Sequence, residues 1–301
     1  MDIRYKGIGH KSNIIYNIAD DFLKSDITTI LCEGTKDENP RPKYKDGIPA
    51  HTLSVNQVSR IYDLALGEFP FCTLRPIAWK SAIKEIFWIY QDASNDLNLL
   101  NEKYRVSYWN DWNIGDGTIG NRYGAVVRKY NLIDNLIHGL KTDPFGRRHI
   151  MDLWQETDLN SSDGLSPCAF LTMWNVRKDN SDNQYYLDLT LIQRSGDMLC
   201  ASGAGNINEI QYACLLLMIS KACGYKAGRF CHFVQNEQIY DRHIDAALEL
   251  SKRESVSAPI IYLDTDKTDF YKFTIDDFKI KNYNREEIIG KNPQLKLDLG
   301  I

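Results

Sequence analysis

Residues 185–193 read YYLDLTLIQ, and this stretch decides the fold. Leu187, Leu189 and Leu191 fall on one face of an extended chain, and more polar residues fall on the other. This period of two predicts a strand with one buried face. Residues 169–176 and 230–234 also suit strands. Because residues 175–184 are polar and turn-like, we expect the first two strands to pair antiparallel.

Helical patterns surround these strands. Residues 79–90 carry apolar side chains at helical spacing, residues 207–223 form a mostly apolar run, and residues 241–254 are amphipathic. Gly224 follows the second of these in the place of a C-terminal cap. A further helix is expected near residues 14–23. The chain is therefore predicted to be α+β, with helices packed against a mainly antiparallel or mixed sheet.

Composition narrows the function classes. The chain has 301 residues and a net charge of -4, so no bulk basic field points to nucleic acid. No apolar run is long enough to span a bilayer, and residues 1–6 lack the apolar core of a signal peptide. We expect a cytoplasmic protein that binds no membrane and requires no nucleic acid.

A polar loop at residues 33–40 suggests an N-terminal extension over 1–38 and a main domain over 39–301.

The seven cysteines are odd in number and scattered, which favours free thiols over a disulfide framework. No Cys-x-x-Cys pair is present. Cys223, Cys231 and His232 lie near one another, but their spacing fits no common zinc site. We therefore expect no bound metal.

Cys168 is the leading candidate nucleophile. It lies in LSPCAF (165–170), and QRSGD (193–197) and NEIQY (208–212) follow it. A lone cysteine is most often a buried core thiol. An arginine brought beside it by the next strand would instead favour the reactive thiolate, and Arg194 is the natural candidate.

Other motifs are ambiguous when taken singly. Arg147 and Arg148 follow a turn and suit either a solvated pair or a phosphate grip, as does Arg41 in its loop. The aromatic stretch YWNDW (108–112) suits a core edge or a wall for a flat heterocycle. SGAGN (202–206) hints at a dinucleotide fingerprint. It lacks the third glycine, however, and we expect no parallel β-α-β context around it.

Taken together, these motifs resemble thymidylate synthase from about Arg41 to Ile301. The matching segments keep the family's order, and we note these: PAHTLSV (49–55), IKEIFW (83–88), YWNDW (108–112), GNRYG (120–124), DPFGRRH (143–149), PC (167–168), RSGD (194–197) and IYDRH (239–243). The similarity is closest to the bacterial and phage type, in which the residue after the cysteine is not histidine; here it is Ala169. The resemblance implies a three-layer-like single domain whose sheet forms a homodimer interface and whose helices pack on the other face.

For the nucleotide, the resemblance implies that Cys168 attacks C6 of the dUMP ring. Arg194 and Ser195 would hold the phosphate with Arg41, while Arg147 and Arg148 would reach it from the other subunit. Asn208 would read the uracil amide edge and distinguish it from cytosine. Gln238, at the position of the family's usual histidine, and Tyr240 would lie near the ribose.

For the second substrate, 5,10-methylenetetrahydrofolate, the resemblance implies that Asp197 orients the pterin and that Tyr108 and Trp109 form its wall. Arg75, at a position where lysine is common, would meet the folate tail. Glu85 would organise proton transfer, and Tyr123 would help remove the C5 proton. Ile301 would close over the site.

One further departure and two alternatives accompany the resemblance. The segment from Asp197 to Asn208 is longer than the family pattern, which leaves Asn206 as a second choice for the base-reading amide. One alternative is a dUMP hydroxymethylase on the same fold, which would add water in place of hydride. The other is a catalytically silent nucleotide-binding or RNA-binding regulator. The expected activity is that of a methyltransferase.

Overall fold

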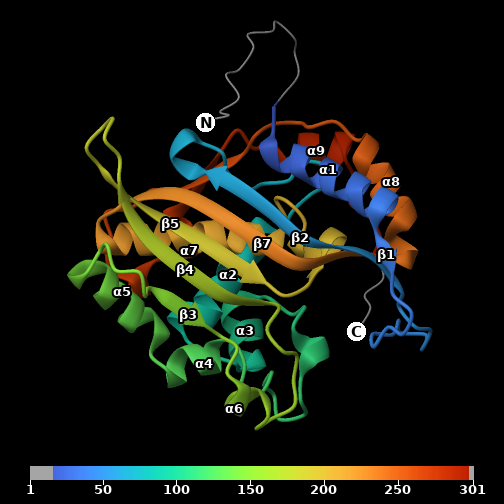
Figure 1. Cartoon of the computed structure of the whole chain (residues 1–301), viewed down its shortest axis with the longest axis horizontal. Coiled ribbons are helices and arrows are strands. Elements are labelled where there is room, and N and C mark those ends of the chain that lie inside the picture. Colours follow the sequence, from blue (N-terminus) through green and yellow to red (C-terminus); the bar gives the residue numbers. More distant parts are fainter. Residues whose placement is uncertain (1–15, 298–301) are drawn as a thin grey trace, which may run out of the picture.

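Strand β5 (Tyr185–Gln193) runs through the middle of the main sheet. The structure, a computed structural model, describes residues 16–297. Within them the sheet runs β1 (Thr35–Lys36), β2 (Thr52–Asp63), β7 (Lys226–Tyr240), β5, β4 (Ala169–Lys178) and β3 (Ile150–Asp152), and β6 (Gly196–Asp197) pairs with β7. β5 pairs antiparallel with β4 and parallel with β7, so the sheet is mixed (Figure 1).

The alternation in β5 places its leucines against the helices. Leu187, Leu189 and Leu191 are fully buried, while the residues between them are half-buried on the opposite face. α7 (Ile207–Cys223) covers the buried face and packs against α2 (Trp79–Ile86). Figure 1 shows both helices behind the sheet, with α1 (Ile18–Glu33) and α8 (Ile244–Lys252) together at one side.

The remaining elements complete the same core. They are α3 (Leu97–Tyr104), α4 (Gly124–Lys129), α5 (Leu132–Thr142), α6 (Glu156–Leu159), the pair β8 (Ile260–Leu263) and β9 (Phe278–Lys281), and α9 (Arg285–Lys291). The chain is a mixed α+β single domain, as the sequence predicts. No helix of the described part is long and apolar enough to cross a membrane.

Several predicted elements are confirmed. α7 has the predicted bounds, and Gly224 ends it with φ 81°. β4 and β5 form the expected antiparallel pair. α2 starts at Trp79 but stops at Ile86, where a π-helical turn over Phe87–Gln91 replaces the expected last turn.

The N-terminal helix was predicted in the wrong place. It spans Ile18–Glu33, because the Asn17 side chain accepts from Ala19 N and Asp20 N and caps the helix there. The start of the predicted range, residues 14 and 15, lies outside the described residues. Leu23, Ile27 and Ile30 are buried in the main core, so this helix packs on the domain itself. The division at residue 38 stays a prediction.

The expected absence of a parallel β-α-β unit is also wrong. β5, α7 and β7 form one, since β5 pairs parallel with β7 and α7 connects them. The glycine-rich segment before α7 nevertheless serves packing. Gly205 has φ 67°, and a Cβ there would lie 2.3 Å from Cys72 N. Only glycine allows this close approach of two backbone segments.

Candidate active site

Strand pairing brings Cys168 beside Arg194. Cys168 precedes β4, and the backbone N–H of Arg194 donates to Cys168 O at 2.9 Å. The Arg194 Nη2 lies 3.5 Å from Cys168 Sγ, and the Ser195 Oγ lies 3.9 Å from it. Arg194 is fixed by its bonds to Pro167 O at 2.9 Å and to Ser166 O at 2.8 Å. A half-buried thiol facing a guanidinium and a hydroxyl matches the surroundings of reactive cysteines.

Tyr123 approaches Cys168 from another element. Its hydroxyl accepts from the backbone N–H of Cys168 at 3.2 Å. Tyr123 adopts φ 46°, and the next residue, Gly124, passes so close to Ser94 that a Cβ would lie 2.1 Å from Ser94 O. The strained turn therefore aims the phenol at the nucleophile. The ring of Trp109 lies edge-on to that of Tyr123, with centroids 5.1 Å apart.

Glu85 on α2 forms the acidic wall of the same site. Its side chain is buried and accepts a hydrogen bond from the Tyr108 hydroxyl. Burial raises the pKa of Glu85, and the hydrogen bond from Tyr108 opposes that rise. The charge of Glu85 also acts on Tyr123, which contacts Cys168, and a buried carboxyl with a raised pKa is suited to exchange protons near neutral pH.

Asn208 lies in the first turn of α7, and its amide reaches two glutamines. Its Oδ1 accepts from Gln193 Nε2 at 3.4 Å, and its Nδ2 donates to Gln211 Oε1 at 3.0 Å. Asn206 is fully buried and bonds Arg75 and Met198 O. The half-buried Asn208 is the asparagine of the two that is open to a ligand.

Asp197 opens the lengthened segment that precedes α7. One of its carboxylate oxygens accepts from the backbone N–H groups of Leu199 and Cys200, both at 3.2 Å, and so caps a π-helical turn over Met198–Ser202. Asp197, Cys200 and His243 also place possible metal-ligand atoms within 4.8 Å of one another. Burial, and next the Asp197 charge, raise the pKa of the Cys200 thiol, which favours its protonated form.

The end of β7 carries the two predicted ribose residues. Gln238 lies across from Asp197 in the β6–β7 ladder. Tyr240 is buried, and burial raises its pKa while the charge of Arg41 acts to lower it. Arg41 itself is exposed. Arg41 and Asp197 thus each lie within electrostatic range of Tyr240.

Two predicted residues lie apart from this cluster, a third is turned into the interior, and a fourth falls outside the described residues. Arg147 and Arg148 are exposed beside a hollow of about 340 Å³ before β3, and within residues 16–297 no hydrogen bond joins them to Cys168. Arg75 is buried and donates to Cys200 O and Asn206 Oδ1, so its guanidinium is committed to the interior of the subunit. Ile301 lies outside the described residues.

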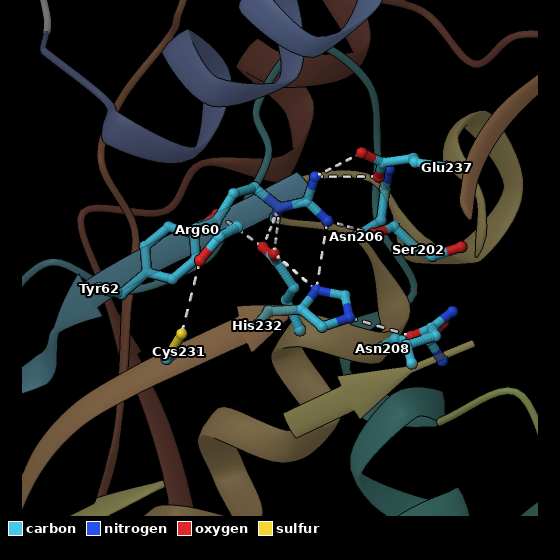
Figure 2. Close-up of polar contacts among 12 residues, drawn as sticks. Arg60, Tyr62, Ser202, Asn206, Asn208, Cys231, His232 and Glu237 are labelled. Atoms are coloured by element: carbon cyan, nitrogen blue, oxygen red, sulfur yellow. Dashed lines mark hydrogen bonds and ion pairs between the residues drawn. The ribbon is translucent and has the colours of Figure 1, made fainter. Parts of the chain in front are cut away.

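Two glutamines and a buried charge cluster were missed from the sequence. Gln193 and Gln211 contact Asn208 directly. Behind them lie Asp26, Arg60, Glu209, His232 and Glu237, which we name the Arg60 cluster (Figure 2). A sequence signal for it existed, because Arg60 takes an inward position of β2, two residues before the buried Tyr62.

Comparisons with known proteins agree with this geometry. The family model of thymidylate synthase matches residues 22–294. Thymidylate synthase of Lactococcus lactis subsp. cremoris is 49% identical over 285 residues, covering 94% of this chain and 99% of the relative. That of Streptococcus pneumoniae is 49% identical over 286 residues, with the same coverage. The structure of the thermostable thymidylate synthase A from Bacillus subtilis matches with a TM-score of 0.82 at 35% identity, over 94% of this chain and 99% of that one. The chain therefore belongs to the thymidylate synthase family.

Proposed function

We propose that this chain is a methyltransferase that converts dUMP to dTMP, with 5,10-methylenetetrahydrofolate as the donor of one carbon and a hydride, and dihydrofolate as the second product. The observation that carries the proposal is the facing of Cys168 Sγ by Arg194 Nη2 and Ser195 Oγ, at 3.5 and 3.9 Å. A positioned thiol beside a cationic phosphate binder suits attack on an electron-poor ring whose phosphate is held alongside.

The positions of the side chains support the following proposed roles. Cys168 attacks C6 of the uracil and thereby makes C5 nucleophilic. Arg194 and Ser195 hold the phosphate together with Arg41, and Asn208 offers one acceptor and one donor to the base. Gln238 and Tyr240 contact the ribose.

The folate side of the site is built from the opposite wall. Trp109 and Tyr108 give the pterin an aromatic surface, and Asp197 orients it with the carboxylate oxygen that does not cap the following turn. Glu85 exchanges protons through water, and Tyr123, close to Cys168, helps to remove the C5 proton. This chemistry calls for no metal. Arg75 is the least supported member of the set, because its guanidinium is already bonded inside the subunit.

The working unit is proposed to be a homodimer. The open face of the main sheet carries a cross-strand row of half-buried apolar side chains, Leu171, Ile192 and Phe233, and Ile61 on β2 is 53% exposed. Such a face is suited to pairing with a second copy. Arg147 and Arg148, which make no contact with their own Cys168, would then complete the partner's phosphate site. A cytoplasmic location stays a prediction.

Product analysis tests the reaction. Purified protein is incubated with dUMP and methylenetetrahydrofolate, and mass spectrometry follows both products. Equal amounts of dTMP and dihydrofolate support the proposal. 5-Hydroxymethyl-dUMP with tetrahydrofolate would establish the hydroxymethylase instead. Binding of dUMP without turnover would point to a silent binding protein.

Subunit mixing tests the shared site. Cys168→Ser and Arg148→Ala chains are each expected to be nearly inactive as homodimers. A mixed dimer has one site with both residues intact, so mixing after denaturation should restore about a quarter of wild-type activity for random pairing. No recovery, with dimers verified by sedimentation, would contradict the exchange of arginines.

A further inference from the structure

The Arg60 cluster lies in the interior, and each guanidinium nitrogen of Arg60 donates a hydrogen bond. The Arg60 side chain is 1% exposed and donates to Glu209 at 2.7 Å, to Asp26 at 2.7 Å and to both oxygens of Glu237 at 2.9 Å. Its Nη2 also donates to Ser202 O, at 2.9 Å, in the lengthened segment before α7. Figure 2 shows Arg60 reaching toward Glu237 on one side and His232 on another. The cluster therefore ties the interior of the sheet to the segment that leads into Asn208.

His232 connects this cluster to the active site. The ring is fully buried, with Nδ1 3.2 Å from Arg60 Nη2 and 3.0 Å from Glu209 Oε1. Its Nε2 lies 3.0 Å from Gln193 Oε1. Gln193 in turn donates its Nε2 to Ser195 O at 2.9 Å and to Asn208 Oδ1 at 3.4 Å. An unbroken chain of polar contacts thus runs from Arg60 to Asn208.

The hydrogens along this chain follow from what each group can do. Ser195 O is a carbonyl and can only accept, so the amide nitrogen of Gln193 must face it. The Gln193 Oε1 then faces His232 Nε2, which must carry the hydrogen. Burial lowers the pKa of His232 and favours the neutral ring, although Glu209 opposes this. Nδ1 has both a donor, Arg60 Nη2 at 3.2 Å, and an acceptor, Glu209 Oε1 at 3.0 Å, within reach, so Nε2 carries its hydrogen whichever state Nδ1 takes.

We propose that His232 is a specificity-determining positioning residue, whose Nε2–H acts together with Ser195 O to hold the amide orientation of Gln193 and, through it, that of Asn208 for uracil against cytosine. The proposal rests on the proposed function of Asn208. Uracil offers an acceptor at O4 and a donor at N3, whereas cytosine offers a donor at N4 and an acceptor at N3. Reading cytosine requires the Asn208 amide to turn over.

Turning the Asn208 amide over is opposed on both sides. Its oxygen would then face Gln211 Oε1, and its nitrogen would face the Gln193 amide nitrogen. Gln193 cannot turn to compensate, because its oxygen would meet Ser195 O and its nitrogen would meet the Nε2–H of His232. A mismatch of two acceptors or two donors costs more than the loss of a hydrogen bond. The acceptor at Ser195 O and the donor at His232 Nε2 therefore hold Gln193, and through it Asn208, in one orientation.

The test compares affinities for two nucleotides in the full-length protein. Calorimetry gives the Kd values of dUMP and dCMP for the wild type, His232→Leu and His232→Gln. His232→Leu removes the donor, and the preference for dUMP should fall about tenfold, as expected for the loss of one neutral hydrogen bond. Glutamine can place an N–H near the position of Nε2, so His232→Gln should keep most of the preference.

Phe230→Leu is the matched control. Its ring is buried and stacks on the His232 ring at 6.2 Å, so the variant disturbs the same packing but keeps the donor. Its stability should fall while the dUMP to dCMP ratio stays unchanged. An unchanged ratio in His232→Leu, or an equal fall in Phe230→Leu, overturns the positioning role.

Nitrogen NMR of the wild-type protein provides a second test that needs no variant. The His232 ring should show a protonated Nε2, and a bare Nε2 overturns the inference. A wild-type protein without preference for dUMP would instead refute the proposed role of Asn208, so the two failures are distinguishable.

Discussion

The Arg60 cluster and the Cys168 site contain similar groups but are held in opposite ways. Arg60 donates at 2.7–2.9 Å to carboxylates that are themselves almost fully buried. Around Cys168 the contacts to the sulfur are longer, 3.5 and 3.9 Å, and the thiol is half-buried. The interior cluster is complete without a ligand, whereas the site leaves donors free for one. Changes in the first should therefore appear in stability, and changes in the second in turnover.

The largest expected effect is the loss of turnover in Cys168→Ser. A serine hydroxyl is a far weaker nucleophile than a thiolate, so kcat should fall by about 10⁴-fold or more, in the range seen when a covalent nucleophile is lost. The free energy of unfolding should change by less than about 0.5 kcal/mol, because the thiol is half-buried and its contacts to Arg194 and Ser195 are long. Steady-state assays and urea titrations measure the two quantities. A fully active Cys168→Ser protein would rule out covalent catalysis at this residue.

Arg60→Met should give the reverse pattern. Removing the cation leaves Glu209 and Glu237 buried without their shared partner, and such a loss typically costs about 3–5 kcal/mol. Urea unfolding at fixed protein concentration measures it, since dimer stability depends on concentration. Arg177→Met is the control: this arginine is 30% exposed and pairs with Asp188 at the surface, so its loss should cost less than about 1 kcal/mol. Equal losses of unfolding free energy in the two variants would mean that burial does not determine how much each arginine contributes.

The stability of Glu237→Gln as a function of pH tests the protonation of one carboxyl in the Arg60 cluster. Burial raises the pKa of Glu237 to about 7 from the usual 4.5, although Arg60 opposes this. Because the folded state holds the proton of Glu237 more tightly than the unfolded state does, this carboxyl stabilises the fold fully below pH 4.5. That contribution disappears as the pH rises to about 7. The stability of Glu237→Gln relative to wild type should therefore rise between these pH values, by up to about 3 kcal/mol.

The titration of Glu209 falls outside the pH range of this measurement. Despite burial, Arg60 lowers its pKa to about 2, so its contribution is lost only below pH 4.5. Asp26, whose pKa is also raised by burial, shares the direction of Glu237 and remains in both proteins. Glu249→Gln, at a side chain that is 59% exposed, is the control for the removal of a surface carboxylate. Parallel curves for Glu237→Gln would show that its carboxyl titrates normally.

The two regions also differ in how far the sequence predicts them. The alternation in residues 185–193 and the apolar run of residues 207–223 determine β5 and α7, because each pattern has one way to bury its apolar side chains. The pairing of β4 with β5 then follows, and with it the approach of Arg194 to Cys168. The Arg60 cluster escaped prediction, because it joins α1, β2, α7 and β7 across long sequence separations.

Side-chain direction is the second limit of the sequence. Asn206 and Asn208 are separated by one residue, and the start of a helix sends one inward to Arg75 and the other toward Gln193. Arg75 was expected at the folate tail because it takes a position where the family often has lysine and keeps the charge. Its bonds to Cys200 O and Asn206 depend on the path of the lengthened segment, which no local pattern specifies. The conformation of that segment had to come from the structure.

The smallest expected effects are at two serines, one in each of the two regions. Ser195 Oγ lies 3.2 Å from Arg194 Nη1 at the proposed phosphate site, and Ser202 Oγ donates to Asp197 O at 3.0 Å in the interior segment. Ser195→Ala should raise the KM for dUMP about tenfold, the effect of one lost hydrogen bond, with kcat changed little. Ser202→Ala should cost about 1 kcal/mol of unfolding free energy and leave the KM for dUMP near the wild-type value. If both changes alter the KM equally, the lengthened segment positions the phosphate site, and the separation between the two regions breaks down at Asp197.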